Sequence, residues 1–197
     1  MKKINIIAIL IGMVIFSNVF VYADEVTDVI NEALQQYQNK EYAAASGSLE
    51  YAAQLVRQKK GELLKALLPE PLDKWTAEEA STQSSGAALF GGGTSVKRDY
   101  RKDSANVTIQ FIVDSPFIQS MSMLFTNPVM ATSDGSKLEK IGKEKALVRY
   151  KENNQRGEVR ILVANRVGVI LEGIGISRDD LLAYAKEINY EKLAELP

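Results

Sequence analysis

The chain contains no cysteine and no histidine. Without cysteine, disulfide bonds, thiolate catalysis and lipid attachment to a cysteine after a leader are excluded. Without histidine, Ser-His-Asp and Cys-His nucleophile systems and zinc sites built from His and Cys are excluded as well. The chemistries that remain are carboxylate pairs, Ser-Lys dyads, tyrosine and metal sites with oxygen ligands. An exported protein without disulfides fits a periplasm better than a harsh extracellular setting.

The sequence also lacks a strong excess of charge of either sign. Its 197 residues carry 24 basic and 25 acidic side chains. Removing Lys2 and Lys3 with a leader leaves 22 basic against 25 acidic groups, a net charge of −3. A near-neutral chain gives no electrostatic basis for binding nucleic acid.

The first residues have the pattern of a secretory signal peptide. Lys2 and Lys3 precede an apolar run at 4–21, and Ala23 supplies a small residue for cleavage. This order predicts a signal peptide over residues 1–23, cleaved after Ala23, and a periplasmic location with only transient membrane contact. The alternative is an uncleaved membrane anchor, because the apolar run approaches spanning length.

Residues 24–68 are expected to form a helical hairpin. Apolar residues recur at three- and four-residue spacing in two runs, which are separated by Gln38-Asn39-Lys40-Glu41. Two helices joined by so short a link must be antiparallel neighbours. Gly61 can break or bend the second helix, which should stop at Pro69-Glu70-Pro71, so we place a domain boundary after residue 68.

The apolar stripe of this hairpin is too large to remain in water. Burying large side chains of this kind stabilises a protein by roughly 1.5–3 kcal/mol each. Packing of the two helices covers only about half of the stripe, and the remainder must lie on the sheet domain, on a second copy or on a partner. Leu49 and Val56 are therefore candidate contacts. The stripe consists of Val26, Val29, Ile30, Leu34, Tyr37, Tyr42, Leu49 and Val56.

Residues 69–197 have the two-residue alternation of half-buried strands. Ser115-Pro116 and Ser177 are typical helix starts, and Ala164-Asn165-Arg166 is typical of a tight hairpin turn. Such an order with short turns predicts an α+β fold, with an antiparallel sheet of about six strands and helices packed on one side. The segment after Trp75 fits either a helix cap or the first strand. Strands are expected near 96–101, 107–113, 138–141, 146–150, 159–163 and 167–171.

Two further stretches supply candidate contacts. The run Gly91-Gly92-Gly93 looks like a phosphate cradle but lacks the Gly-Lys-Ser/Thr ending of a P-loop. We interpret it as a loop or wide hairpin, or as a flap that presents Leu89 and Phe90 to a ligand or partner. Tyr100 and Arg101 follow in a basic strand, and such a run is usually the solvated side of a strand.

Two resemblances to known families follow from the order of these features. Tyr42, Ala45, Leu49 and Ala52 resemble the second helix of a single tetratricopeptide repeat. The second domain resembles, in layout, the Mog1/PsbP/DcrB-like proteins, which implies a binding or accessory domain of exported or assembly-factor proteins. This layout consists of a Pro-then-Trp entry at Pro71 to Trp75, a helix after Ser115-Pro116, a late hairpin and a Ser-Arg-Asp-Asp helix start at Ser177.

Together these features favour a non-catalytic, exported protein-interaction or accessory module without a cofactor, which binds a protein partner or itself through the helical hairpin. Catalysis is disfavoured because the adjacent acids Asp179 and Asp180 diverge by about 100° on a helix and do not share a site. The alternative function is a carrier or sensor of a small apolar ligand or lipid, held between sheet and helix near Phe90, Phe117 and Tyr150.

Overall fold

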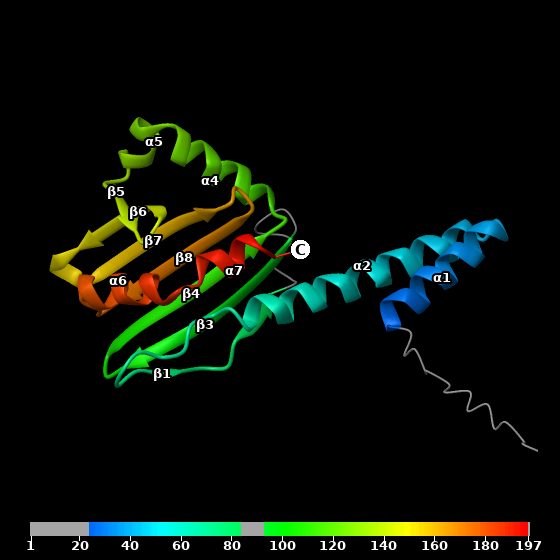
Figure 1. The fold of residues 1–197 in the computed structure, drawn as a ribbon, viewed down its shortest axis with the longest axis horizontal. Coiled ribbons are helices and arrows are strands. Elements are labelled where there is room, and N and C mark those ends of the chain that lie inside the picture. The colour runs from blue at the N-terminus through cyan, green and yellow to red at the C-terminus, as the bar shows by residue number, and fades with distance from the viewer. Residues whose placement is uncertain (1–23, 84–92, 197) are drawn as a thin grey trace, which may run out of the picture.

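The computed structural model describes residues 24–83 and 93–196, which form a projecting helical hairpin and a body of sheet and helices (Figure 1). The predicted signal peptide at residues 1–23 and the candidate contacts Leu89 and Phe90 lie outside the described residues. Within the described ranges, no helix is long and apolar enough to cross a membrane.

The hairpin consists of α1 (Glu25–Gln38) and α2 (Tyr42–Lys65). The carboxylate of Asp24 accepts a hydrogen bond from a backbone amide in the first turn of α1, as expected of an N-cap. Lys40, with a φ of 67°, reverses the chain between the two helices. The expected pair of helices is therefore present.

Gly61 does not end or break α2, which continues past it to Lys65. A Cβ atom at position 61 would lie 2.9 Å from Cγ2 of Thr82, a residue of strand β2 (Ser81–Gln83). Glycine at this position therefore allows the strand to approach the helix backbone closely.

The body is built on one antiparallel sheet of eight strands within the described residues. The strands pair in the order β1-β3-β4-β8-β7-β6-β5, and β2 pairs with β3 beside β1. The α+β class and the antiparallel sheet are confirmed, and the segment after Trp75 is a strand, not a helix cap. The other strands are β1 (Thr76–Ala77), β3 (Thr94–Lys102), β4 (Ala105–Val113), β5 (Lys137–Ile141), β6 (Glu144–Lys151), β7 (Arg156–Val163) and β8 (Val167–Ile174).

Local signals placed the helix starts and the last turn correctly. The Ser115 hydroxyl accepts a hydrogen bond from the Phe117 amide, and the Ser177 hydroxyl accepts one from the Asp180 amide. Asn165, with a φ of 54°, makes the tight turn between β7 and β8. The helices of the body are α4 (Pro116–Thr126), α5 (Pro128–Thr132), α6 (Arg178–Glu187) and α7 (Tyr190–Ala194).

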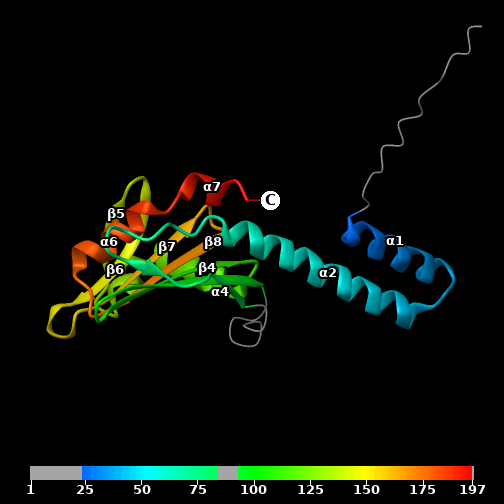
Figure 2. The ribbon, with the colours of Figure 1, turned by 90° about the horizontal axis from the view of Figure 1, so that it is seen from below.

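Helices cover both faces of the sheet, and in this respect the arrangement differs from the expected single side. Gly173 of β8 faces Leu181 of α6, whereas Gly168 of the same strand faces Met121 of α4. Residues 168 and 173 differ by an odd number of positions, so they point to opposite faces. Figure 2 shows α6 and α7 on one side of the sheet and α4 on the other. The uninterrupted apolar run 111–113 in β4 is the sequence signal for this two-sided burial.

The last turns of α2 and the residues after it enter the core of the body. Leu64 is fully buried, and Leu68 packs in the same apolar cluster as Trp75. The hydroxyl of Tyr100 donates a hydrogen bond of 2.7 Å to the carbonyl oxygen of Pro69, which fixes the exit of the helix. The rest of α2, together with α1, extends away from the body (Figure 2).

Candidate functional site

The seam between α1 and α2 is made largely of small side chains. Val26 and Ala33 of α1 are buried against α2, which contributes Ala45, Ala52 and Leu55. Small residues allow two helices to approach closely, but they bury little apolar area. The larger apolar side chains of the hairpin are therefore left outside the seam.

Six of these larger side chains form the surface that we name the hairpin face. Each of them exposes between 46% and 62% of its area. On the surface of a single chain, contiguous apolar side chains that are half exposed are a mark of an interaction site. The hairpin face consists of Ile30, Leu34 and Tyr37 of α1, and Tyr42, Leu49 and Val56 of α2.

The six side chains lie on the same side of the hairpin. Leu34 directly follows the seam residue Ala33, and Val56 directly follows the seam residue Leu55. One step along a helix turns a side chain by about 100°, so each set lies about a quarter-turn from the seam. Because the helices are antiparallel, this common sense of rotation brings both sets to one side. The rings of Tyr37 and Tyr42 meet edge to face, with centroids 5.7 Å apart.

The other side of the seam is polar and ties the two helices together. The Tyr51 hydroxyl donates to the Glu25 carboxylate at 2.9 Å, and this hydrogen bond raises the pKa of the phenol. The Ser48 hydroxyl donates to the side-chain carbonyl of Gln36 at 2.8 Å. These bonds fix the rotation of both helices and hold Glu25 on the side opposite the hairpin face.

The predicted contacts do not form one site. Leu49 and Val56 belong to the hairpin face. Tyr100 was a wrong candidate for a surface contact, because it is fully buried in the core. Arg101 is exposed and pairs with Glu78 at 2.8 Å. Adjacent strand residues point to opposite faces, so Tyr100 and Arg101 could not share one surface.

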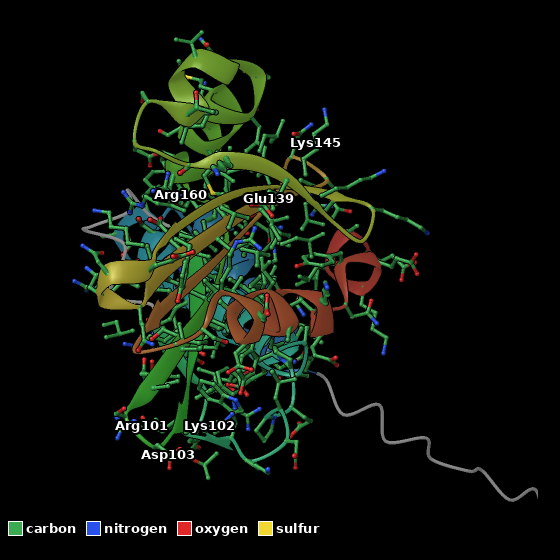
Figure 3. All side chains as sticks on the ribbon, turned by 90° about the vertical axis from the view of Figure 1, so that its left-hand side faces the viewer. Arg101, Lys102, Asp103, Glu139, Lys145 and Arg160 are labelled. Atoms are coloured by element: carbon green, nitrogen blue, oxygen red, sulfur yellow. The ribbon has the colours of Figure 1, made fainter. Side chains whose placement is uncertain are left out.

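Arg101 also lies at the wrong end of the body to act with the hairpin. It stands beside Lys102 and Asp103 at the turn between β3 and β4 (Figure 3), whereas Asp114, which α2 contacts, follows the other end of β4. α2 contacts the body through Leu64 and through an ion pair of 2.7 Å between Lys60 and Asp114, which follows β4. The charged tip of β3 is therefore separate from the hairpin face.

The space expected for an apolar ligand is not assembled as the sequence suggested. Phe117 packs with Ile118 on the α4 face of the sheet, whereas Tyr150 packs with the core on the α6 face. The Tyr150 hydroxyl is occupied, since it donates to the carbonyl of Ile176 at 2.7 Å. Phe90, the third expected lining residue, lies outside the described residues.

The open part of the α4 face carries a charge network that sequence reasoning missed. Glu158 accepts hydrogen bonds from both Arg149 and Arg160, and Arg160 also pairs with Asp134 at 3.3 Å. Hydrogen bonds from Ser136, and after them the positive charges of Arg160 and Arg149, lower the pKa of Asp134. The alternation of Glu158 and Arg160 along β7 is the signal that could have found it. The positive and negative charges of these four side chains balance, so the network offers little net charge to a partner.

A shallow depression of about 310 Å³ lies next to this network, where β6, β7 and β8 end. Charged side chains, among them Arg156 and Glu172, line it together with Ile174. Such a lining suits water and ions better than an apolar molecule. No group of three or more acidic side chains in residues 24–83 and 93–196 is arranged to hold a metal ion.

Comparisons with protein-family models, curated proteins and solved structures gave no match. The layout resemblance to Mog1/PsbP/DcrB-like proteins therefore stays a prediction.

Proposed function

We propose that this chain is an exported, non-catalytic interaction module that binds another polypeptide through the hairpin face. The observation that carries this proposal is the exposure of six large apolar side chains on a projecting hairpin. These six side chains belong neither to the seam between the helices nor to the contact of α2 with the body, because other residues make both. Burying such a surface against a partner removes apolar area from water and is the main favourable term in most protein association.

The composition of the surface favours a polypeptide over nucleic acid or an anionic membrane. α1 carries Glu25, Asp28 and Glu32 and no basic residue. Residues 24–68 together carry seven acidic and five basic side chains, so the hairpin has no net positive charge to attract phosphate groups. Tyr37 and Tyr42 lie at the end of the hairpin, and tyrosine is enriched in the buried centres of protein interfaces. The partner should therefore present an apolar surface with little charge.

Replacing Leu49 and Val56 with serine tests the proposal. Both side chains are about half exposed in the single chain, so the melting temperature of the purified mature protein, measured at a concentration too low for self-association, should change little. The double variant should lose the proteins that the native mature chain captures by cross-linking in a periplasmic extract. Gln54→Ser on the outer side of the same helix is the matched control and should keep them. Capture that survives the double substitution would contradict the proposal, as would a melting temperature that falls sharply.

Export is a separate part of the proposal and is supported by the leader in the sequence. The intact mass of the protein recovered from its native compartment should correspond to a chain that begins at Asp24. A protein that retains Met1 or Lys2 would contradict cleavage after Ala23.

A further inference from the structure

The hairpin face has the periodicity of a helix that packs against other helices along its length. Tyr42, Leu49 and Val56 recur every seven residues on α2, and the exposed Leu63 continues the line. A seven-residue repeat of apolar residues keeps one seam facing a partner helix over many turns. A compact loop or an extended peptide does not present side chains with a seven-residue period, so the spacing points to a helical partner.

On α2, small side chains lie beside the row of large side chains formed by Tyr42, Leu49 and Val56. Ser46 and Ala53 are both exposed, and they lie one turn before and one turn after Leu49 on the side of α2 that turns away from α1. In a helix bundle, large side chains of one helix insert between those of the next, and small residues leave room for them. α1 supplies side chains of fitting size, Ile30 and Leu34, on the same side of the hairpin.

The area of the hairpin face matches what a pair of copies needs. Large side chains present about 200 Å² when fully exposed, so six that are half exposed offer about 600 Å² per copy. Two copies together would bury about 1,200 Å², the lower bound for a specific protein interface. One copy against a small ligand would leave most of this area in water.

On α1, charge does not oppose the meeting of two identical faces, and on α2 Lys60, one turn after Val56, is paired with Asp114. Two acids of α1 are engaged elsewhere, since Glu25 bonds to Tyr51 and Glu32 bonds to Gln36. The third, Asp28, is two positions before Ile30 and therefore points about 160° away from it around the helix. Thr27 and Gln38, which flank the hairpin face on α1, are uncharged. A surface that is apolar and free of like charges can pack against a copy of itself under twofold symmetry.

We infer that the occupant of the hairpin face is the hairpin of a second copy, so that α1 and α2 of two chains form a four-helix bundle. This inference rests on the proposed function and names the partner. The bundle buries the six side chains of each copy and holds the two sheet bodies outside the bundle, because the contacts of α2 with the described part of its body come from its last turns.

Sedimentation equilibrium of the mature protein tests this inference directly. Twice the protomer mass is expected at micromolar concentration, and Leu49→Ser with Val56→Ser should weaken association at least about 100-fold while leaving the circular dichroism unchanged. Gln54→Ser should dimerise as the native protein does. A dimer that is unaffected by the double substitution overturns the inference, because association then uses another surface.

Because the chain has no native cysteine, cross-linking through one introduced cysteine gives a second, independent measurement. Leu49→Cys should give a covalent dimer with a short bismaleimide, whereas Gln54→Cys on the outer side of α2 should not. A monomer at about 100 µM that yields no Leu49→Cys dimer overturns the inference. If the protein is such a monomer and the double serine variant still loses the captured proteins, the proposed function stands with a different partner. If the double serine variant still captures those proteins, the proposed function and the dimer inference both fail.

Discussion

Leu63 and Leu64 are neighbours on α2 with opposite environments, and replacing each with alanine tests how the hairpin is attached. Leu64 is fully buried in the core of the body, whereas Leu63 exposes 49% of its area. The two substitutions delete the same atoms from the same helix turn, so their effects on helix propensity are equal. Any difference in stability therefore reports the contact between α2 and the sheet.

The expected difference is large. A fully buried Leu→Ala substitution costs about 2–5 kcal/mol, because it loses transfer free energy and leaves a cavity. For Leu63, which is half in water, we expect less than about 1 kcal/mol. With a urea m-value of about 2 kcal/mol/M for a domain of this size, Leu64→Ala should lower the unfolding midpoint by about 1–2.5 M.

Urea unfolding followed by circular dichroism and by the fluorescence of Trp75 measures both effects. Trp75 lies in the same apolar cluster as Leu64, so its signal reports the body rather than the hairpin alone. The two signals should change together, because α2 shares its core with the sheet. Equal midpoints for Leu63→Ala and Leu64→Ala, or a helical transition that precedes the fluorescence transition, would refute the shared core.

Three other outcomes follow from single groups in the structure. Tyr100→Phe should cost about 1 kcal/mol in urea unfolding, because it removes a buried hydrogen bond of 2.7 Å to a backbone carbonyl; an unchanged midpoint would contradict this. Gly47→Ala should raise the melting temperature through helix propensity, since nothing lies within 4 Å of the added carbon, whereas Gly61→Ala should give no such gain because that carbon would meet β2 at 2.9 Å. Burial raises the pKa of Tyr184 to about 12, and an unfolded tyrosine titrates near about 10. The unfolded state therefore loses this proton first, so the contribution of Tyr184 to the free energy of unfolding should be constant below about pH 10 and fall from there to about pH 12. Tyr184→Phe should make that fall shallower.

Several features could be read from the sequence because they depend on residues close together in the chain. The cap at Ser177, the turn at Asn165 and the antiparallel pairing of the two N-terminal helices each follow from local geometry. Alternation within strands placed the main strands of the sheet. The same alternation could have shown that Tyr100 is buried, because its side chain shares a face with the buried Val96 and not with Arg101.

The assignment of each apolar residue to a partner could not be read in this way. The stripe of the hairpin was visible, but its division into a seam of small residues and an exposed face depends on the rotation of the two helices about their axes. That rotation is set by contacts between residues distant in sequence, such as Gln36 with Ser48. Gly61 shows the same limit, since its role depends on Thr82 of a strand that starts after the helix has ended.

The sequence by itself determined the helical hairpin, the six main strands and the antiparallel class of the sheet, because backbone propensity and side-chain period act within a few residues. Only the tertiary structure decided that helices cover both faces, that Leu64 belongs to the core and that Leu49 remains in water. These outcomes depend on how surfaces far apart in the chain compete for burial, and that competition is settled when the whole molecule packs.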